Sequence, residues 1–105
     1  MIIKRGLNIE SPKPPLWFAL GAAEMVFNLL FNKDFVVTSL DDSHEDKPRS
    51  LHNQGLAFDC RIHHLSPEQA KHISDILQQN LDPLGFDPIL EGDHIHCEYD
   101  RKPGE

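Results

Sequence analysis

Two clusters of histidine and acidic residues in this sequence of 105 residues have the composition of a divalent metal site. The first cluster is the segment 50–59, Ser-Leu-His-Asn-Gln-Gly-Leu-Ala-Phe-Asp, with His52 at the end of a loop and Asp59 on the next strand. Gly55 lies between them, and glycine adopts backbone angles that other residues avoid, so the chain can fold back and bring His52 toward Asp59. Ala57 lies on the same strand face as Asp59, and its small side chain leaves room beside the carboxylate.

The second cluster is the segment 91–96, Glu-Gly-Asp-His-Ile-His. Side chains two residues apart on a strand project from the same face, so we expect His94 and His96 to lie together. Two imidazoles and a carboxylate from separate strands suit a divalent transition metal, and Zn²⁺ is the best candidate. Three protein ligands leave a fourth position for water, as in catalytic zinc sites. Glu91 or Asp93 would then be near enough to take a proton from that water.

The composition predicts one globular domain, 1–105, and excludes several function classes. Hydrophobic residues make up 39% and charged residues 26%, a globular balance. The net charge of −7 argues against nucleic-acid binding, which needs clustered Lys and Arg. Two cysteines are too few for a disulfide scaffold or an all-Cys zinc site.

The sequence predicts neither a membrane segment nor a secretion signal. Its longest apolar stretch, 16–31, contains Glu24 and Asn28 and is shorter than the roughly 20 residues of a membrane span. Prolines at 12, 14 and 15 stand where a signal peptide would become helical. We therefore expect a protein made in the cytoplasm.

Hydrophobic periodicity assigns the elements that must position the two clusters. An apolar stripe at three- and four-residue steps follows Pro15, with Leu16 as its first and Leu30 as its last member. Ser66 to Gln69 has the pattern of a helix N-terminus with a capping box. The expected order is an extended arm (1–10), a helix (15–30), a strand (35–38), a polar loop (39–50), a strand (55–62), a helix (66–81) and two strands (86–90 and 94–99). This order predicts an α+β fold with two main helices on a small, mostly antiparallel sheet.

The pattern Ser-x-His-x-x-Gly-x-Ala-x-Asp at 50–59, followed by Asp-His-x-His at 93–96, resembles the M15 zinc peptidases. This family includes D-Ala-D-Ala carboxypeptidases and L-alanyl-D-glutamate endopeptidases, and shares one scaffold with the hedgehog signalling domain. The resemblance covers about residues 35–99 and implies a hedgehog/DD-peptidase-like fold. It also implies that His52, Asp59 and His96 are the zinc ligands.

The same resemblance implies that Asp93 is the general base and that His94 stabilises the charged transition state. A second assignment stays open, because the family places its third ligand three residues after its acid. Glu91 with His94 has that spacing, as does Asp93 with His96. We prefer the second pair because it uses all four residues of Asp-His-x-His.

The sequence departs from the family before the polar loop. Family members often carry Ser-Gly-Tyr-Arg there, with the Arg binding substrate, whereas 38–42 is Thr-Ser-Leu-Asp-Asp and has no Arg. Arg49 is a candidate for the missing role, with a solvated loop charge as the alternative. Ser50 would cap or orient the loop that carries His52, so both residues are substrate-binding candidates.

By resemblance, the expected substrate is the peptide stem of bacterial peptidoglycan, cut by carboxypeptidase or endopeptidase action. The enzyme would act on the cell wall as a monomer, and a phage origin would suit this activity. The alternative is a zinc-binding interaction module without turnover, as the hedgehog relatives illustrate.

Overall fold

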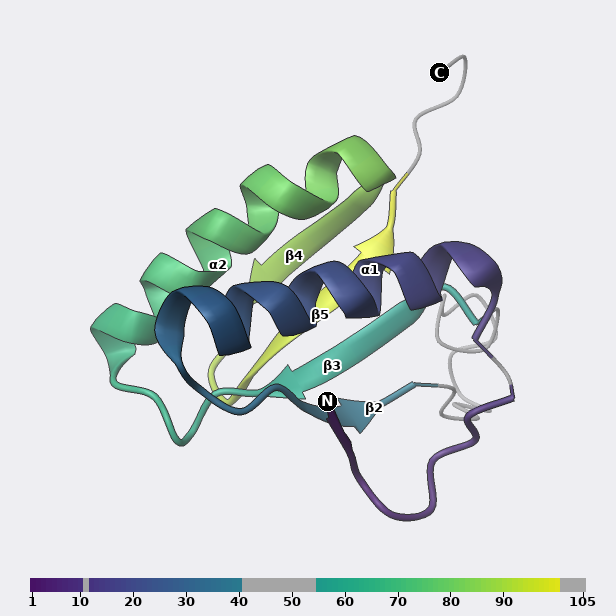
Figure 1. The fold of residues 1–105 in the computed structure, drawn as a ribbon, viewed down its shortest axis with the longest axis horizontal. Coiled ribbons are helices and arrows are strands. Elements are labelled where there is room, and N and C mark those ends of the chain that lie inside the picture. Colours follow the sequence, from purple (N-terminus) through teal and green to yellow (C-terminus); the bar gives the residue numbers. More distant parts are fainter. Residues whose placement is uncertain (11, 41–54, 101–105) are drawn as a thin grey trace.

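The computed structural model describes residues 1–10, 12–40 and 55–100, which form a five-stranded mixed sheet with two helices packed on one face (Figure 1). The strand order is β1-β2-β3-β5-β4, so β3 is central and β5 lies beside it. β1 runs parallel to β2, and the three other neighbouring pairs are antiparallel. This confirms the predicted α+β class with two main helices. The strands are β1 (Ile2–Ile3), β2 (Val36–Ser39), β3 (Ala57–Arg61), β4 (Phe86–Leu90) and β5 (His94–Tyr99).

The hydrophobic core lies between the sheet and the two helices. Phe58 and Cys60 of β3 and Ile95 and Cys97 of β5 are fully buried in it. Because side chains alternate along a strand, the intervening residues of β3 and β5 point away from the helices. The buried stripe of α2 (Pro67–Leu81) completes this part of the core with Ala70, Ile73, Leu77 and Leu81.

The start of α2 has the predicted capping box. The backbone N–H of Gln69 donates to Ser66 Oγ at 3.1 Å, and the backbone N–H of Ser66 donates to Gln69 Oε1 at 3.0 Å. A short 3₁₀ turn, η2 (Asp82–Leu84), follows α2 and leads to Gly85, which has φ +87°. A Cβ on Gly85 would lie 2.7 Å from the Tyr99 ring, so glycine is needed here for both conformation and space.

The first helix differs from the single regular helix expected over 15–30. α1 (Pro14–Met25) is α-helical, and the chain continues as a π-helical turn, η1 (Val26–Leu30). A π turn holds more residues than an α turn, which rotates the residues that follow around the axis. Leu30, expected on the buried stripe, is therefore 62% exposed, and that expectation was wrong.

The N-terminal arm has a partner that periodicity did not predict. The backbone N–H of Ile2 donates to Phe35 O, and that of Lys4 donates to Val37 O, both at 2.9 Å. These bonds make β1 an edge strand beside β2. Within the part of the chain that the structure describes, no helix is both long and apolar enough to cross a bilayer.

We predict that Ser66→Ala lowers the free energy of unfolding by about 1 kcal/mol, because the substitution removes the side-chain half of the capping box. Urea denaturation followed by circular dichroism measures the change. Gln79→Ala, at an exposed position of the same helix, is the control and should change stability by only a few tenths of a kcal/mol. Equal effects of the two substitutions would contradict the capping role.

Candidate metal-binding site

The described candidate ligands lie on the two middle strands, on the sheet face away from the helices. β3 and β5 pair with Asp59 opposite His96 and Arg61 opposite His94. This antiparallel register places one acidic and two imidazole side chains side by side on the same face. The structure thus brings Asp59, His94 and His96 together, although 37 residues separate Asp59 from His96 along the chain.

The carboxylate of Asp59 lies between the two imidazoles. His96 Nδ1–H donates to Asp59 Oδ1 at 2.7 Å, and His94 Nε2 lies 3.9 Å from Asp59 Oδ2. The three side chains are 18% to 27% exposed, so water has limited access to them. Each oxygen of one carboxylate thus faces a different histidine.

His94 also contacts both acids that the sequence offered as general base. Its Nδ1–H donates to Asp93 Oδ1 at 2.5 Å, and its Nε2 lies 3.8 Å from Glu91 Oε2. Asp93 is 90% exposed and Glu91 is 47% exposed, so both carboxylates are open to water. This geometry is compatible with Asp93 or Glu91 as the base.

The hydrogen bonds in the cluster shift two ionisation equilibria. The hydrogen bond to Asp59 raises the pKa of His96 above its ordinary value of 6.5, against the opposing effect of partial burial. The hydrogen bond from His94 lowers the pKa of Asp93 below its usual 3.8. Asp93 is ionised at neutral pH even at its usual pKa of 3.8, and the lowering makes its carboxylate a weaker base.

Asp59 and His96 suit a zinc ion in donor type. Two donors on one tetrahedral zinc lie about 3.3 Å apart, given metal–ligand bonds of about 2.0–2.1 Å. The 2.7 Å between Asp59 Oδ1 and His96 Nδ1 is shorter and is a hydrogen-bond distance, so a zinc ion held by both atoms would replace this hydrogen bond.

The third predicted ligand is not among the described residues. Within residues 1–10, 12–40 and 55–100, no three His, Cys, Asp or Glu side chains converge closely enough to hold a metal ion. The predicted set needs His52, which lies outside the described residues, as do Arg49 and Ser50.

The two cysteines are on the other side of the sheet and do not belong to this site. Cys60 and Cys97 are free and fully buried in the core. Burial raises the pKa of Cys60 to about 12 and that of Cys97 well above its usual value. Both therefore remain neutral thiols that fill space in the core, as expected from the alternation of β3 and β5.

The site includes two charged residues to which the sequence analysis gave no role in it. Glu98 Oε2 lies 3.6 Å from His96 Nε2, and Arg61 stands opposite His94 on the same face. Strand alternation could have predicted both positions, because Glu98 lies two residues after His96 and Arg61 lies two residues after Asp59. Arg61 is thus a cation on the face that carries the acidic cluster.

A pocket of about 320 Å³ adjoins the turn between β4 and β5. Glu91 and Asp93, the two acids that contact His94, are among its lining residues. Most of the remaining lining is apolar: Ile62, Leu65, Pro67, Ala70 and Leu90, with His63 and Gly92. An apolar pocket beside convergent polar groups is a common form of ligand site.

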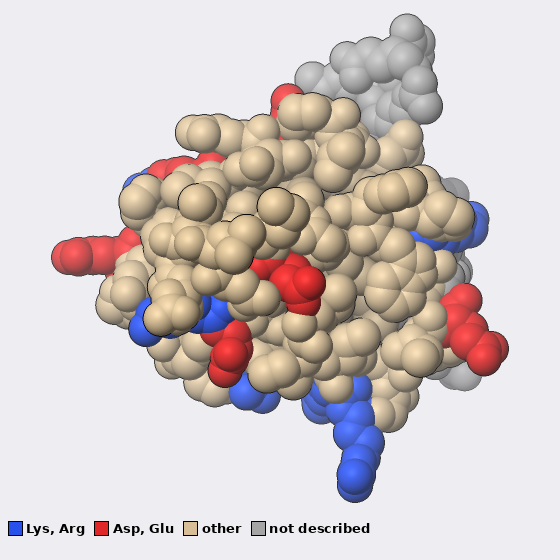
Figure 2. Space-filling view, viewed as in Figure 1, with Lys and Arg blue, Asp and Glu red and all other residues tan. Residues whose placement is uncertain are grey.

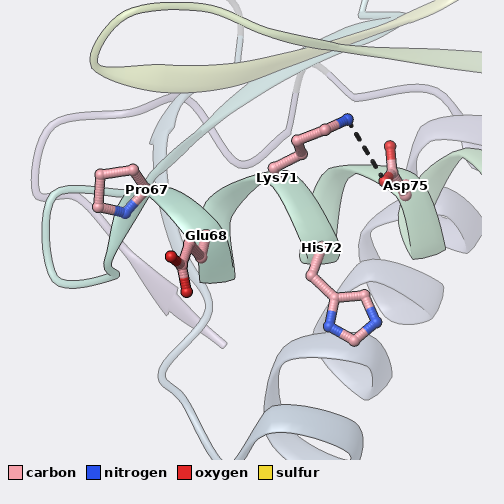
Figure 3. A pocket seen from close by; sticks show the side chains of 5 residues that line it. All are labelled: Pro67, Glu68, Lys71, His72 and Asp75. Carbon is pink, nitrogen blue, oxygen red and sulfur yellow. Dashed lines mark ion pairs between the residues drawn. The ribbon is translucent and has the colours of Figure 1, made fainter.

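A second hollow, of about 420 Å³, lies on the exposed side of α2 and has no connection with this cluster. Figure 3 shows its lining, in which Lys71 pairs with Asp75 at 3.6 Å and His72 points away from that pair. The His72 ring packs edge-on against Phe31, with 5.1 Å between ring centroids. His72 is exposed and provides a control for the histidines on the sheet.

No known family profile matches this sequence, and no curated protein matches it. The resemblance to zinc peptidases accordingly rests on the two sequence motifs at 50–59 and 93–96.

We predict that Asp59→Asn lowers the pKa of His96 toward 6.5 in metal-free protein, because the charged hydrogen-bond acceptor is lost. NMR titration of the imidazole protons measures this change. A raised folded-state pKa adds stability that is complete below the unfolded-state value and is lost as pH rises through the folded-state value. The stability advantage of the wild type over Asp59→Asn should therefore be largest below pH 6.5.

Asp75→Asn, on the exposed side of α2, is the matched control and should leave the His96 titration unchanged. An unaltered His96 pKa in Asp59→Asn would show that the hydrogen bond between the two strands does not form in solution.

Proposed function

We propose that this protein is a zinc-dependent peptidase that cleaves the peptide stems of bacterial peptidoglycan. The observation that supports this most is the position of Asp59 between His94 and His96 on the middle strands of the sheet. The motifs at 50–59 and 93–96 resemble those of the M15 zinc peptidases. The proposal includes a hedgehog/DD-peptidase-like scaffold, with which a mixed sheet covered on one face by two helices is compatible.

In this proposal His52, Asp59 and His96 hold the zinc ion. When bound, zinc would supply a Lewis acid that polarises the scissile carbonyl and makes water a stronger nucleophile at neutral pH. Glu98, 3.6 Å from His96 Nε2, would orient the imidazole from the side opposite Asp59.

Asp93 and His94 would carry the proton and the developing charge. Asp93 is an exposed carboxylate that is ionised at neutral pH, so it can take a proton from the attacking water. The same carboxyl would return that proton to the leaving amine. The His94 imidazole would stabilise the negative charge that grows on the carbonyl oxygen.

The surroundings of the cluster suit an extended peptide. The pocket beside the turn between β4 and β5 would take a substrate side chain next to the proposed base. Arg49 and Ser50 remain the proposed substrate-binding pair from the sequence, and Arg61 offers a further cation for a substrate carboxylate on the same sheet face.

A second candidate is a zinc-binding module without turnover, and one feature near β2 favours it. Where the family carries its substrate-binding Arg, this chain has Ser39 and Leu40, both buried. The cationic group used by the family is thus missing at this place, and catalysis would have to use another cation.

We predict that the purified protein carries about one zinc ion per chain. Substitution of any one proposed ligand, in His52→Ala, Asp59→Ala or His96→Ala, should weaken zinc binding by more than about 100-fold. Competition with a chromophoric chelator measures the affinity, and elemental analysis gives the stoichiometry.

His72→Ala is the control, because His72 lies on the exposed side of α2 and should keep wild-type affinity. His94→Ala should also keep zinc if His96 is the third ligand, and should lose it if His94 takes that place. If all the variants bound zinc with equal affinity, the proposed zinc site would be wrong.

We predict that Asp93→Ala loses stem hydrolysis by a factor of about 10² to 10⁴ while it retains zinc, because the general base is removed and the ligands remain. Mass spectrometry of digested cell-wall fragments measures activity and identifies the bond that is cut. Glu91→Ala is the matched control, since Glu91 also contacts His94 and should remain active.

The opposite result, loss of activity only in Glu91→Ala, would assign the base to Glu91. A wild-type protein that holds zinc and releases no fragments from several wall types would favour the module without turnover.

A further inference from the structure

The helical segment formed by α1 and η1 is apolar on both of its sides. Its inner side, including Leu16, Leu20 and Phe27, is fully buried against the sheet. Its outer side carries large apolar side chains that face solvent, with Phe18 70%, Met25 59%, Leu29 73% and Leu30 62% exposed. A surface helix usually has a polar outer side, and a helix that is apolar all round is usually buried. We call Phe18, Ala22, Met25, Leu29 and Leu30 the apolar helix face.

The apolar helix face is large enough to need an explanation. With Trp17, which is 37% exposed at one end, its large side chains are about 60% exposed on average. Even if each of these five side chains had the roughly 200 Å² of an aromatic one, they would leave at most about 600 Å² of apolar surface in water. This is at the upper limit for a monomeric protein. Burying it in two copies would remove about 1,200 Å², the lower bound of a stable interface.

The charges around this face disfavour a lipid surface as the partner. Helices that lie on membranes carry Lys and Arg along their polar side. Between Pro14 and Leu30 there is neither Lys nor Arg, and Glu24 is the one acid. Glu24 pairs with the terminal ammonium of Met1. Figure 2 shows the side of the molecule with the two helices as mostly uncharged, with Lys and Arg toward its margins.

The apolar helix face combines a helical seam with a hollow. Phe18, Ala22 and Met25 follow each other at steps of four and three residues in α1, the spacing of a seam between two packed helices, and Leu29 lies on the π-helical turn that follows. A hollow of about 190 Å³ opens among Ala22, Met25, Leu29, Leu30 and neighbouring residues. In an antiparallel two-fold pairing, Phe18 of one copy lies over the region of Leu29 in the other, where that hollow is.

We propose that the apolar helix face is the interface of a symmetric dimer in which α1 packs antiparallel against α1 of a second copy. This departs from the monomer expected from the sequence. The sheet face that carries Asp59 and His96 lies on the other side of the molecule and stays open in such a dimer.

Sedimentation equilibrium tests this proposal by measuring the average molar mass of the wild-type protein from low micromolar to near millimolar concentration. We expect a reversible transition from monomer to dimer that tightens with added salt, because each copy carries a net charge of −7. Trp17 is the one tryptophan of the chain, so its fluorescence should shift to the blue over the same concentration range.

Leu29→Glu should weaken the dimer by at least about tenfold, because it places an unpaired charge in the interface. Ile9→Glu is the matched control, since Ile9 is 56% exposed outside this face, and it should leave the dimer intact. Circular dichroism of both variants verifies that they are folded. A wild type that stays monomeric throughout would overturn the proposal, and so would a dimer that Leu29→Glu does not weaken. A monomer that binds neutral lipid vesicles through this face would assign the face to a membrane instead.

Discussion

The candidate site depends on the register in which β3 pairs with β5, which sets Asp59 directly opposite His96. In this register His96 Nδ1–H donates to the carboxylate of Asp59. A shift of one residue in this register would turn an entire set of side chains to the other face of the sheet. The polar cluster and the core are therefore two results of the same strand pairing.

The core specifies that pairing. Phe58 and Cys60 alternate with Asp59 along β3, and Ile95 and Cys97 alternate with His96 along β5. Exposing these four apolar side chains would cost several kcal/mol, far more than one hydrogen bond on the other face contributes. The hydrophobic pattern of the strands thus positions the polar residues, and the hydrogen bond adjusts their local geometry and the pKa of His96.

The two faces of the molecule have different chemistry. The open sheet face gathers His94, His96 and several carboxylates, where a cation would relieve the repulsion among the acids. The outer side of α1 is apolar and nearly free of charge. The proposed metal site and the proposed dimer interface therefore lie on separate surfaces.

The sequence by itself determined the class of the fold, both β4 and β5 to the residue, the capping box of α2, and the shared face of Asp59 with Ala57. Each of these depends on neighbours a few residues apart, and local periodicity and capping chemistry record them directly. It could not determine the partner of the N-terminal arm or the π-helical turn that exposes Leu30. The tertiary structure decided both features. The arm pairs with a segment more than thirty residues away along the chain, and the π-helical turn sets how the end of the helix is rotated when it packs. Neither of these leaves a repeating pattern in the order of the residues.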